Sequence, residues 1–259
     1  IFVFDMGITG AGISTFTGET CSMLVLLRMT RMKRNIHIDP HNFSPRSELL
    51  KEIFAGGTPS LTRQGMASVS VAMLNVAAGA YGDAAIAAMS IVNRIAFVLL
   101  AAMIGLGQGF QPMCGFCYGA KLYARVREGY WFIVRVGFTF MAVCAVFGFL
   151  FSEECIDVFR RDPDVVAVGM VALRWQLVTL PLGVIVMYTN MMMQTIRMPW
   201  QANLLAASRN GLFFIPLILL LPHFFGLLGV EMCQAWSDLL SFAIAVPITI
   251  SGFKALRED

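Results

Sequence analysis

The sequence predicts an all-α membrane protein, a bundle of helices that cross the lipid bilayer several times. The 259 residues are 58% hydrophobic and only 14% charged, and their mean hydropathy is +0.72. Soluble domains are typically about 45–50% apolar and about 25% charged, so this chain has too few charges to cover a water-exposed surface. The composition excludes a cytosolic enzyme, a disordered linker and a secreted disulfide scaffold.

Seven apolar stretches are long enough to cross the hydrocarbon core, which takes about 20 helical residues. They cover residues 2–27, 53–80, 85–112, 129–152, 166–194, 200–221 and 227–252. A polar, basic connector separates the first two, and no stretch alternates as a β-strand does. The chain begins Ile-Phe-Val-Phe, without an initiator methionine or a basic leader, so we expect it to be part of a longer protein.

The basic residues predict how the helices are oriented. Alternate connectors carry most of the lysines and arginines, whereas the opposite side carries only Arg160 and Arg161 among several acidic residues. The positive-inside rule assigns the basic side to the cytoplasm. We therefore expect a multi-pass protein of the plasma membrane with an external first residue and a cytoplasmic C-terminus.

Several kinds of chemistry are not indicated by the sequence. The net charge is +3, and no basic stripe carries interleaved aromatic residues, so we expect no nucleic-acid partner. The three histidines share no helix face, and Cys114 and Cys117 lack a second ligand pair for a metal. No pattern pairs a nucleophile with a base. We expect neither a catalytic residue nor a metal site, and hence no enzyme activity.

Polar and flexible side chains inside the predicted spans are the candidates for a substrate cavity. An unpaired polar group is unfavourable in hydrocarbon, so such residues pair with one another or serve a function. They cluster on single faces of several spans at 100° per residue, and methionines add surfaces that adapt to many shapes. The alternative for the methionines is ordinary packing. The candidates are Gln64, Asn75, Asn93, Gln108, Gln111, Met187, Asn190, Met191, Gln194 and Gln234.

Charged residues inside the spans are candidates for ion coupling or for structural ion pairs. They are Glu19, Arg63, Arg94, Arg209 and Asp238. Arg63 is close enough to the cytoplasmic interface to snorkel, whereas Arg94 lies deep enough to need a carboxylate or carbonyl partner. Glu19 also needs a partner. Asp238 is either a protonatable site or the structural partner of Arg94 or Arg209, and the sequence leaves both readings open.

Three stretches resemble the multidrug and toxic compound extrusion (MATE) transporters. Residues 105–121, which read Gly-Leu-Gly-Gln-Gly-Phe-Gln-Pro and end in Tyr-Gly-Ala-Lys, look like the family's Gly-Gln-x-x-Gln-Pro…Gly-x-Asn-Tyr-Gly-Ala signature. Cys117 stands where the family usually has Asn. Residues 208–216 are similar to the family's Arg-x-Gly…Pro helix, and residues 226–240 to its Gly-Val…Gln-x-x-Ala-Asp-Leu ending.

The resemblance also implies how the chain is organised. Residues 7–14 look like the family's sixth helix and residues 57–60 like the start of its seventh. The chain would then hold helices six to twelve of a twelve-helix transporter with two six-helix lobes. Residues 1–28 would be the last helix of a missing N-terminal lobe, residues 29–52 a cytoplasmic connector, and residues 53–259 the C-terminal lobe.

The resemblance implies a function as well. MATE transporters are secondary active transporters that export amphipathic, often cationic drugs or toxic compounds in exchange for H⁺ or Na⁺ by alternating access, a mechanism that rocks two repeats around a central site. The partners implied are the small-molecule substrates, the lipid bilayer and the missing lobe. No cofactor is implied apart from the coupling ion.

One departure from the family concerns the coupling ion. Some members carry a cation-binding carboxylate pair on their seventh and tenth helices. Residues 53–80 and 166–194 contain no Asp or Glu at all. We therefore expect any coupling carboxylates to lie mainly in the missing lobe, with Glu19 and Asp238 as the strong candidates in this chain.

Two alternatives to drug efflux remain open. A lipid-linked precursor flippase of the same superfamily would need a basic groove to hold a pyrophosphate. The arginines inside the spans are spread over five helices, one on each, which favours no single basic groove. They are Arg63, Arg94, Arg135, Arg174 and Arg209. The other alternative is a half-transporter that does not transport.

Overall fold

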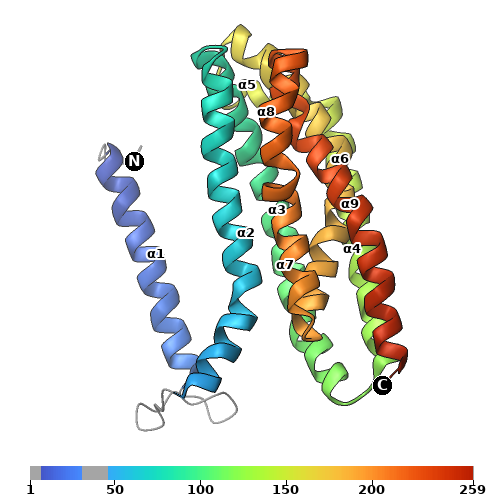
Figure 1. The fold of residues 1–259 in the computed structure, drawn as a ribbon. Coiled ribbons are helices and arrows are strands. Elements are labelled where there is room, and N and C mark those ends of the chain that lie inside the picture. The colour runs from blue at the N-terminus through green and yellow to red at the C-terminus, as the bar shows by residue number, and fades with distance from the viewer. Residues whose placement is uncertain (1–6, 31–45, 259) are drawn as a thin grey trace. The chain divides into compact units, whose positions relative to one another are not determined.

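The computed structural model describes residues 7–30 and 46–258, and the chain divides into two compact units (Figure 1). The units are Ile1–Leu50 and Lys51–Asp259. The first contains helix α1 (Gly7–Thr30). Most of the predicted connector, residues 29–52, lies outside the described residues, and its last part is helical from Ser47 onward.

The described residues are almost entirely helical and contain no β-strand, which confirms the predicted all-α class. From α2 onward the helices follow one another with short connections. They are α2 (Ser47–Gly79), α3 (Asp83–Gly119), α4 (Tyr123–Leu150), α5 (Ser152–Asp157), α6 (Pro163–Thr195), α7 (Pro199–Ala207), the π-helix η2 (Ser208–Leu212), α8 (Phe214–Phe225) and α9 (Leu227–Glu258).

Five helical stretches of the described chain are long and apolar enough to cross a membrane. They are α3, α4, α6, the continuous run from α7 through η2 to α8, and α9, and they coincide with five of the seven predicted spans. The protein is therefore a multi-pass membrane protein. The spans predicted at 2–27 and 53–80 form α1 and α2 but do not reach this standard. Both are rich in glycine and hydroxyl residues and contain a charge, Glu19 or Arg63, which lowers their mean hydropathy.

Local sequence explains where several helices begin and turn. Asp162 caps α6, because its side chain accepts a hydrogen bond from the Asp164 N–H at 3.2 Å, and Pro163 occupies the first helical position. The turns before α3 and α9 place Gly82 and Gly226 at positive φ, where a residue without Cβ is favoured. These turns keep the helices antiparallel to their neighbours in sequence.

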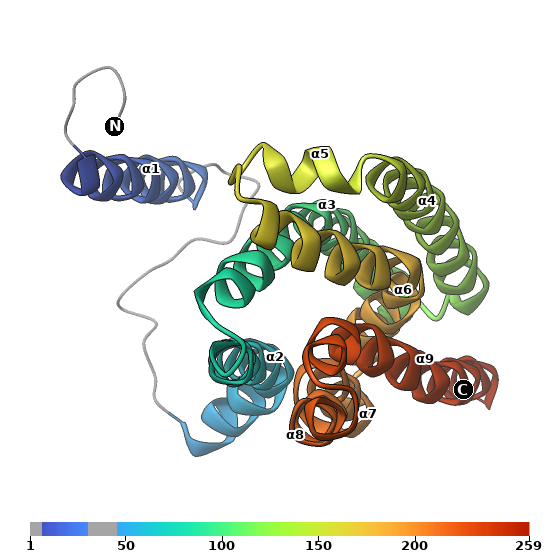
Figure 2. The ribbon, with the colours of Figure 1, turned by 90° about the horizontal axis from the view of Figure 1, so that it is seen from above.

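Helix α6 is the central element of the second unit and packs against α3, α4 and α9 (Figure 2). Its most apolar window is 56% buried, against 28–33% for the other four spans. Two methionines of α6 fill spaces above glycines of its neighbours. Met191 lies against Gly107 of α3, and Met193 lies against Gly252 of α9. A larger residue at either glycine would force the end of the facing methionine to move, so the glycines let α6 pack closely against α3 and α9.

A hydroxyl cluster, made of Tyr130, Thr189 and Thr249, joins three helices inside this packed region. The Tyr130 hydroxyl and Thr189 Oγ1 are 2.8 Å apart, and Thr189 Oγ1 and Thr249 Oγ1 are 2.7 Å apart. All three residues are buried. Because each hydroxyl has a partner, the cluster links α4, α6 and α9 without an unsatisfied group at its centre.

Candidate functional site

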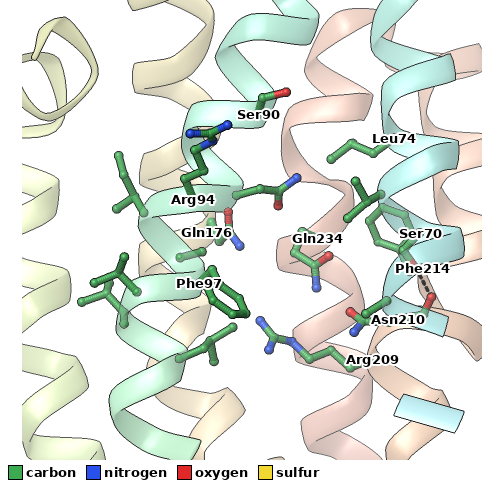
Figure 3. A pocket seen from close by; sticks show the side chains of 18 of the residues that line it. Ser70, Leu74, Ser90, Arg94, Phe97, Gln176, Arg209, Asn210, Phe214 and Gln234 are labelled. Atoms are coloured by element: carbon green, nitrogen blue, oxygen red, sulfur yellow. Dashed lines mark hydrogen bonds between the residues drawn. The ribbon is translucent and has the colours of Figure 1, made fainter. Parts of the chain in front are cut away.

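A cavity of about 900 Å³ lies among α2, α3, α6, η2, α8 and α9 in the second unit (Figure 3). Most of its wall is apolar, with a limited set of polar groups, as is usual for sites that bind small organic molecules. The polar lining residues are Ser70, Asn75, Ser90, Asn93, Arg94, Gln176, Arg209, Asn210 and Gln234. Figure 3 shows Arg94 and Gln176 near one wall, with Gln234, Arg209 and Asn210 near the opposite wall.

An ion pair anchors Arg209 beside the cavity. Arg209 Nε donates to Asp238 Oδ1 at 2.6 Å, and Nη2 donates to Oδ2 at 3.2 Å. Gln234 Nε2 donates to the same Oδ1 at 3.0 Å. The Asp238 side chain is fully buried, whereas that of Arg209 is 19% exposed. Of the two partners that the sequence left open for Asp238, the structure therefore selects Arg209.

The π-helix η2 sets the position of Arg209. Two side chains hold its backbone from neighbouring helices: Ser70 Oγ of α2 donates to the Asn210 carbonyl, and Ser237 Oγ of α9 donates to the Arg209 carbonyl. Short π-helical segments inside α-helices occur frequently at functional sites. Sequence analysis did not predict this segment, and Gly211 and the nearby Pro216 were the only local signs of irregular backbone.

Several polar groups of the cavity have no partner within the described residues. The side chains of Asn75, Asn93, Arg94 and Gln176 make no hydrogen bond or ion pair there, although all four line the cavity. Within the described residues Arg94 has no carboxylate or carbonyl partner, so the expectation of one stays a prediction. Arg94 is exposed at the cavity, so solvent or a ligand can satisfy its guanidinium group.

Two predicted cavity residues instead join helices away from the cavity. Gln111 Nε2 donates to Gln194 Oε1 at 3.3 Å. Gln194 Nε2 in turn donates to the Gly56 carbonyl at 3.0 Å and to Ser60 Oγ at 3.2 Å. These bonds connect α3, α6 and the N-terminal part of α2, and neither glutamine lines the cavity.

Three further candidates on α6 belong to its packing. Asn190 is buried, and its Nδ2 donates to the Ala202 carbonyl of α7 at 2.5 Å. Met191 is buried against Gly107, and Met187 is half-buried against the core. The positions of the two methionines agree with the packing alternative that the sequence left open for them.

The remaining candidates also lie outside the cavity. Gln64 and Gln108 are exposed, and Arg63 is half-buried on α2. Glu19 is exposed on α1 within the first unit. The candidates that the structure brings together are thus Asn75, Asn93, Arg94, Arg209 and Gln234. Sequence reasoning missed Ser70 and Asn210, since small polar residues are common in membrane helices and carry no distinctive spacing.

A family comparison identifies the chain. The model of the MatE family matches residues 59–220. The chain belongs to the MatE family. The prediction from the sequence motifs is thereby confirmed.

Curated MatE relatives extend well beyond the matched region. The chain is 25% identical over 246 residues to the multidrug export protein MepA of Staphylococcus saprophyticus, which covers 94% of this chain and 53% of that protein. It is 22% identical over 259 residues to MepA of Staphylococcus haemolyticus, covering 99% of this chain and 56% of that protein. The chain spans about half the length of the curated relatives it matches.

Solved MATE structures share the fold of this chain. A mutant of the Vibrio cholerae MATE transporter VcmN matches with a TM-score of 0.85 at 21% identity, over 100% of this chain and 58% of that one. A MOP superfamily transporter from Pyrococcus furiosus matches with a TM-score of 0.87 at 22% identity, over 99% and 59%. The partial coverage fits a chain that corresponds to one portion of a MATE transporter.

Proposed function

We propose that the full-length protein in which this chain occurs is a secondary transporter that exports amphipathic compounds across the plasma membrane. The observation that carries this proposal is the cavity of about 900 Å³, where amide and guanidinium groups without partners face an apolar wall inside a membrane helix bundle. Such a surface binds molecules that have both polar and apolar parts. The names of the curated relatives, multidrug export proteins, support the same activity.

Exchange against H⁺ or Na⁺ remains part of the proposal. Within this chain, coupling through Asp238 would act on an ion pair, because Arg209 holds both carboxylate oxygens. Protonation of Asp238 would release Arg209 toward the cavity, so ion binding and substrate binding would be linked through one side chain. Glu19, on α1, is the other coupling candidate in the described residues. The basic connectors support a cytoplasmic C-terminus.

A lipid-linked precursor flippase is the second candidate function, and one observation favours it. The arginines inside the spans are scattered in the sequence, yet Arg94 of α3 and Arg209 of η2 line the same cavity. Two guanidinium groups in one cavity are a starting point for holding phosphate groups. Both functions place the substrate at the same site.

Dye efflux tests the proposed export directly. Cells without their own efflux pumps would carry the full-length protein, and the loss of accumulated ethidium or fluorescein would be followed by fluorescence. We expect the double substitution Asn93→Ala with Gln176→Ala to slow efflux about five- to tenfold at equal expression. The matched control is Gln201→Ala, a half-buried amide of α7 outside the cavity, and efflux should be unchanged. No efflux of either dye by the unmodified protein would reject the proposal.

A further inference from the structure

We propose that the cavity binds the anionic group, a carboxylate or a phosphate, of an amphipathic compound, and that Arg94 is the residue that holds this group. The inference rests on the proposed function in that it names the substrate class of the same cavity. It departs from the lipophilic cations expected from the family resemblance. The carrying observation is that, within the described part of the chain, Arg94 has no partner, lies among other unpaired polar groups, and lines a cavity that no carboxylate lines.

The charges around the cavity favour an anion. The lining residues include two arginines and neither Asp nor Glu. Asp238 balances Arg209 through their ion pair, so the charge of Arg94 is left over. Glu231 is buried on the same face of α9 as Asp238. It does not line the cavity, and it forms no ion pair with any described arginine. Among the described residues no carboxylate balances the charge of Arg94, so this charge attracts an anion that enters the cavity and disfavours a cation.

The donors around Arg94 suit carboxylate or phosphate oxygens. A guanidinium group presents a planar fork of N–H donors that matches both anions. Asn93 and Gln176 add amide N–H groups that are without partners in the described chain. On the opposite wall, Arg209 uses Nε and Nη2 for Asp238, and its Nη1 has no partner among the described residues. Figure 3 shows this side chain reaching from η2 toward Phe97. An anion held by Arg94 thus has further donors available across the cavity.

The apolar wall suits the rest of such a molecule. Phe97 and Val98 follow Arg94 on α3, line the cavity and are 65% and 69% exposed. Leu74 and Phe214 close the opposite side and are buried. A hydrocarbon or aromatic tail that covers Phe97 and Val98 would pack against this apolar surface. The ligand is therefore amphipathic rather than a free inorganic anion.

A titration with matched ligands tests the inference. The full-length protein in nanodiscs of phosphatidylcholine would be titrated with octyl phosphate, octanoate and octyltrimethylammonium, which share one tail and differ in charge. We expect both anions to bind at least tenfold more tightly than the cation. Arg94→Gln should weaken anion binding about tenfold or more, because a hydrogen-bonded ion contact is lost. Arg94→Glu should reverse the order and favour the cation.

The control variant is Arg135→Gln, which removes an exposed arginine of α4 outside the cavity and should leave all three affinities unchanged. Thermal unfolding of each variant separates binding from folding. Tighter binding of the cation by the unmodified protein would overturn the inference. The inference would also be overturned if Arg94→Gln lowered the unfolding temperature and left anion binding unchanged, because Arg94 would then stabilise the fold instead of binding the ligand.

A lipid headgroup and a soluble compound can both supply the anion. A further competition experiment distinguishes these two sources. Competition with octyl phosphate by phosphatidylglycerol added to the nanodiscs identifies the bilayer as the source. Undiminished binding identifies a soluble amphipathic anion. The proposed export and the anion site can fail independently. If anion binding depends on Arg94 but cells show no efflux of either dye, the inference about the cavity is retained and the transport function is rejected.

Discussion

Polar groups are treated differently in two regions of the helix bundle. In the hydroxyl cluster, Tyr130, Thr189 and Thr249 are buried and bond to one another across α4, α6 and α9. In the cavity, Asn93 and Gln176 also lie inside the bundle, but they have no partner within the described residues. Membrane proteins satisfy polar groups internally where nothing else can reach them. The difference indicates that the hydroxyl cluster holds the fold, while the cavity keeps its polar groups available for a ligand.

The Arg209–Asp238 pair combines a buried, fully bonded group like those of the hydroxyl cluster with a group that lines the cavity. Asp238 is buried like the hydroxyl cluster and both of its oxygens are bonded, whereas Arg209 lines the cavity. The backbone of η2 is fixed by Ser70 and Ser237 in the same place. A ligand that contacts Arg209 would therefore act on a group that also stabilises the packing of η2 against α9.

The largest expected effect comes from a glycine in the packed region. In Gly229→Ala the added Cβ would overlap the Leu221 carbonyl group and the Pro222 nitrogen, which are backbone atoms of α8 just before the tight turn to α9. Backbone atoms cannot rotate away, so we expect a loss of about 3 kcal/mol in the free energy of unfolding, measured by thermal unfolding in detergent. In the control Gly109→Ala the Cβ meets open space and stability should hold. Equal unfolding temperatures for both variants would show that the turn is looser than described.

The second prediction breaks the pair that joins the two regions. Asp238→Leu leaves Arg209 without its carboxylate, and we expect a loss of about 2–3 kcal/mol, less than for a fully buried pair because Arg209 is 19% exposed. The double variant Arg209→Met with Asp238→Leu should recover much of this loss, because no unpaired charge remains. A double variant as unstable as the single one would argue against an unpaired arginine as the cause. Denaturant unfolding in micelles provides the measurement.

The sequence predicted the positions of the long helices better than it predicted which polar side chains line the cavity. Hydropathy located the five long membrane spans, because an apolar stretch of sufficient length has few alternatives in a membrane protein. It did not predict the short helix α5, which is six residues long and rich in acidic residues. Periodicity placed Asn93 and Gln108 on one arc of the third span, yet only Asn93 lines the cavity. They are 15 residues apart in the sequence, or about 22 Å along a helix, and periodicity gives direction around the axis rather than depth.

The partner of Asp238 could not be chosen from the sequence for a related reason. Arg94 and Arg209 were both plausible, but it is Arg209, on the π-helix η2, whose guanidinium group bonds to the carboxylate. An irregular segment of five residues leaves no periodic signal. The unpaired state of Arg94 was likewise hidden, since it depends on the cavity formed by several separate helices.

The third prediction addresses the hydroxyl cluster itself. Tyr130→Phe removes the hydroxyl that bonds to Thr189, and we expect a loss of about 1 kcal/mol, the usual contribution of one hydrogen bond inside a membrane protein. Transport by the folded protein should continue at its normal rate, because Tyr130 does not line the cavity. Tyr118→Phe is the control, since the Tyr118 hydroxyl makes no hydrogen bond within the described residues. Slower transport at unchanged stability would place Tyr130 in the transport machinery instead.

The smallest expected effect on stability belongs to the cavity. Asn93→Ala combined with Gln176→Ala removes two amides that bond to nothing in the described chain, so the free energy of unfolding should change by less than about 0.5 kcal/mol. The most direct measurement is the unfolding temperature and the dye efflux rate of this double variant, taken on the same preparation of full-length protein. We predict unchanged unfolding and efflux slowed about five- to tenfold. Lower stability with normal efflux would mean that these amides hold the fold and that the cavity does not bind the substrate.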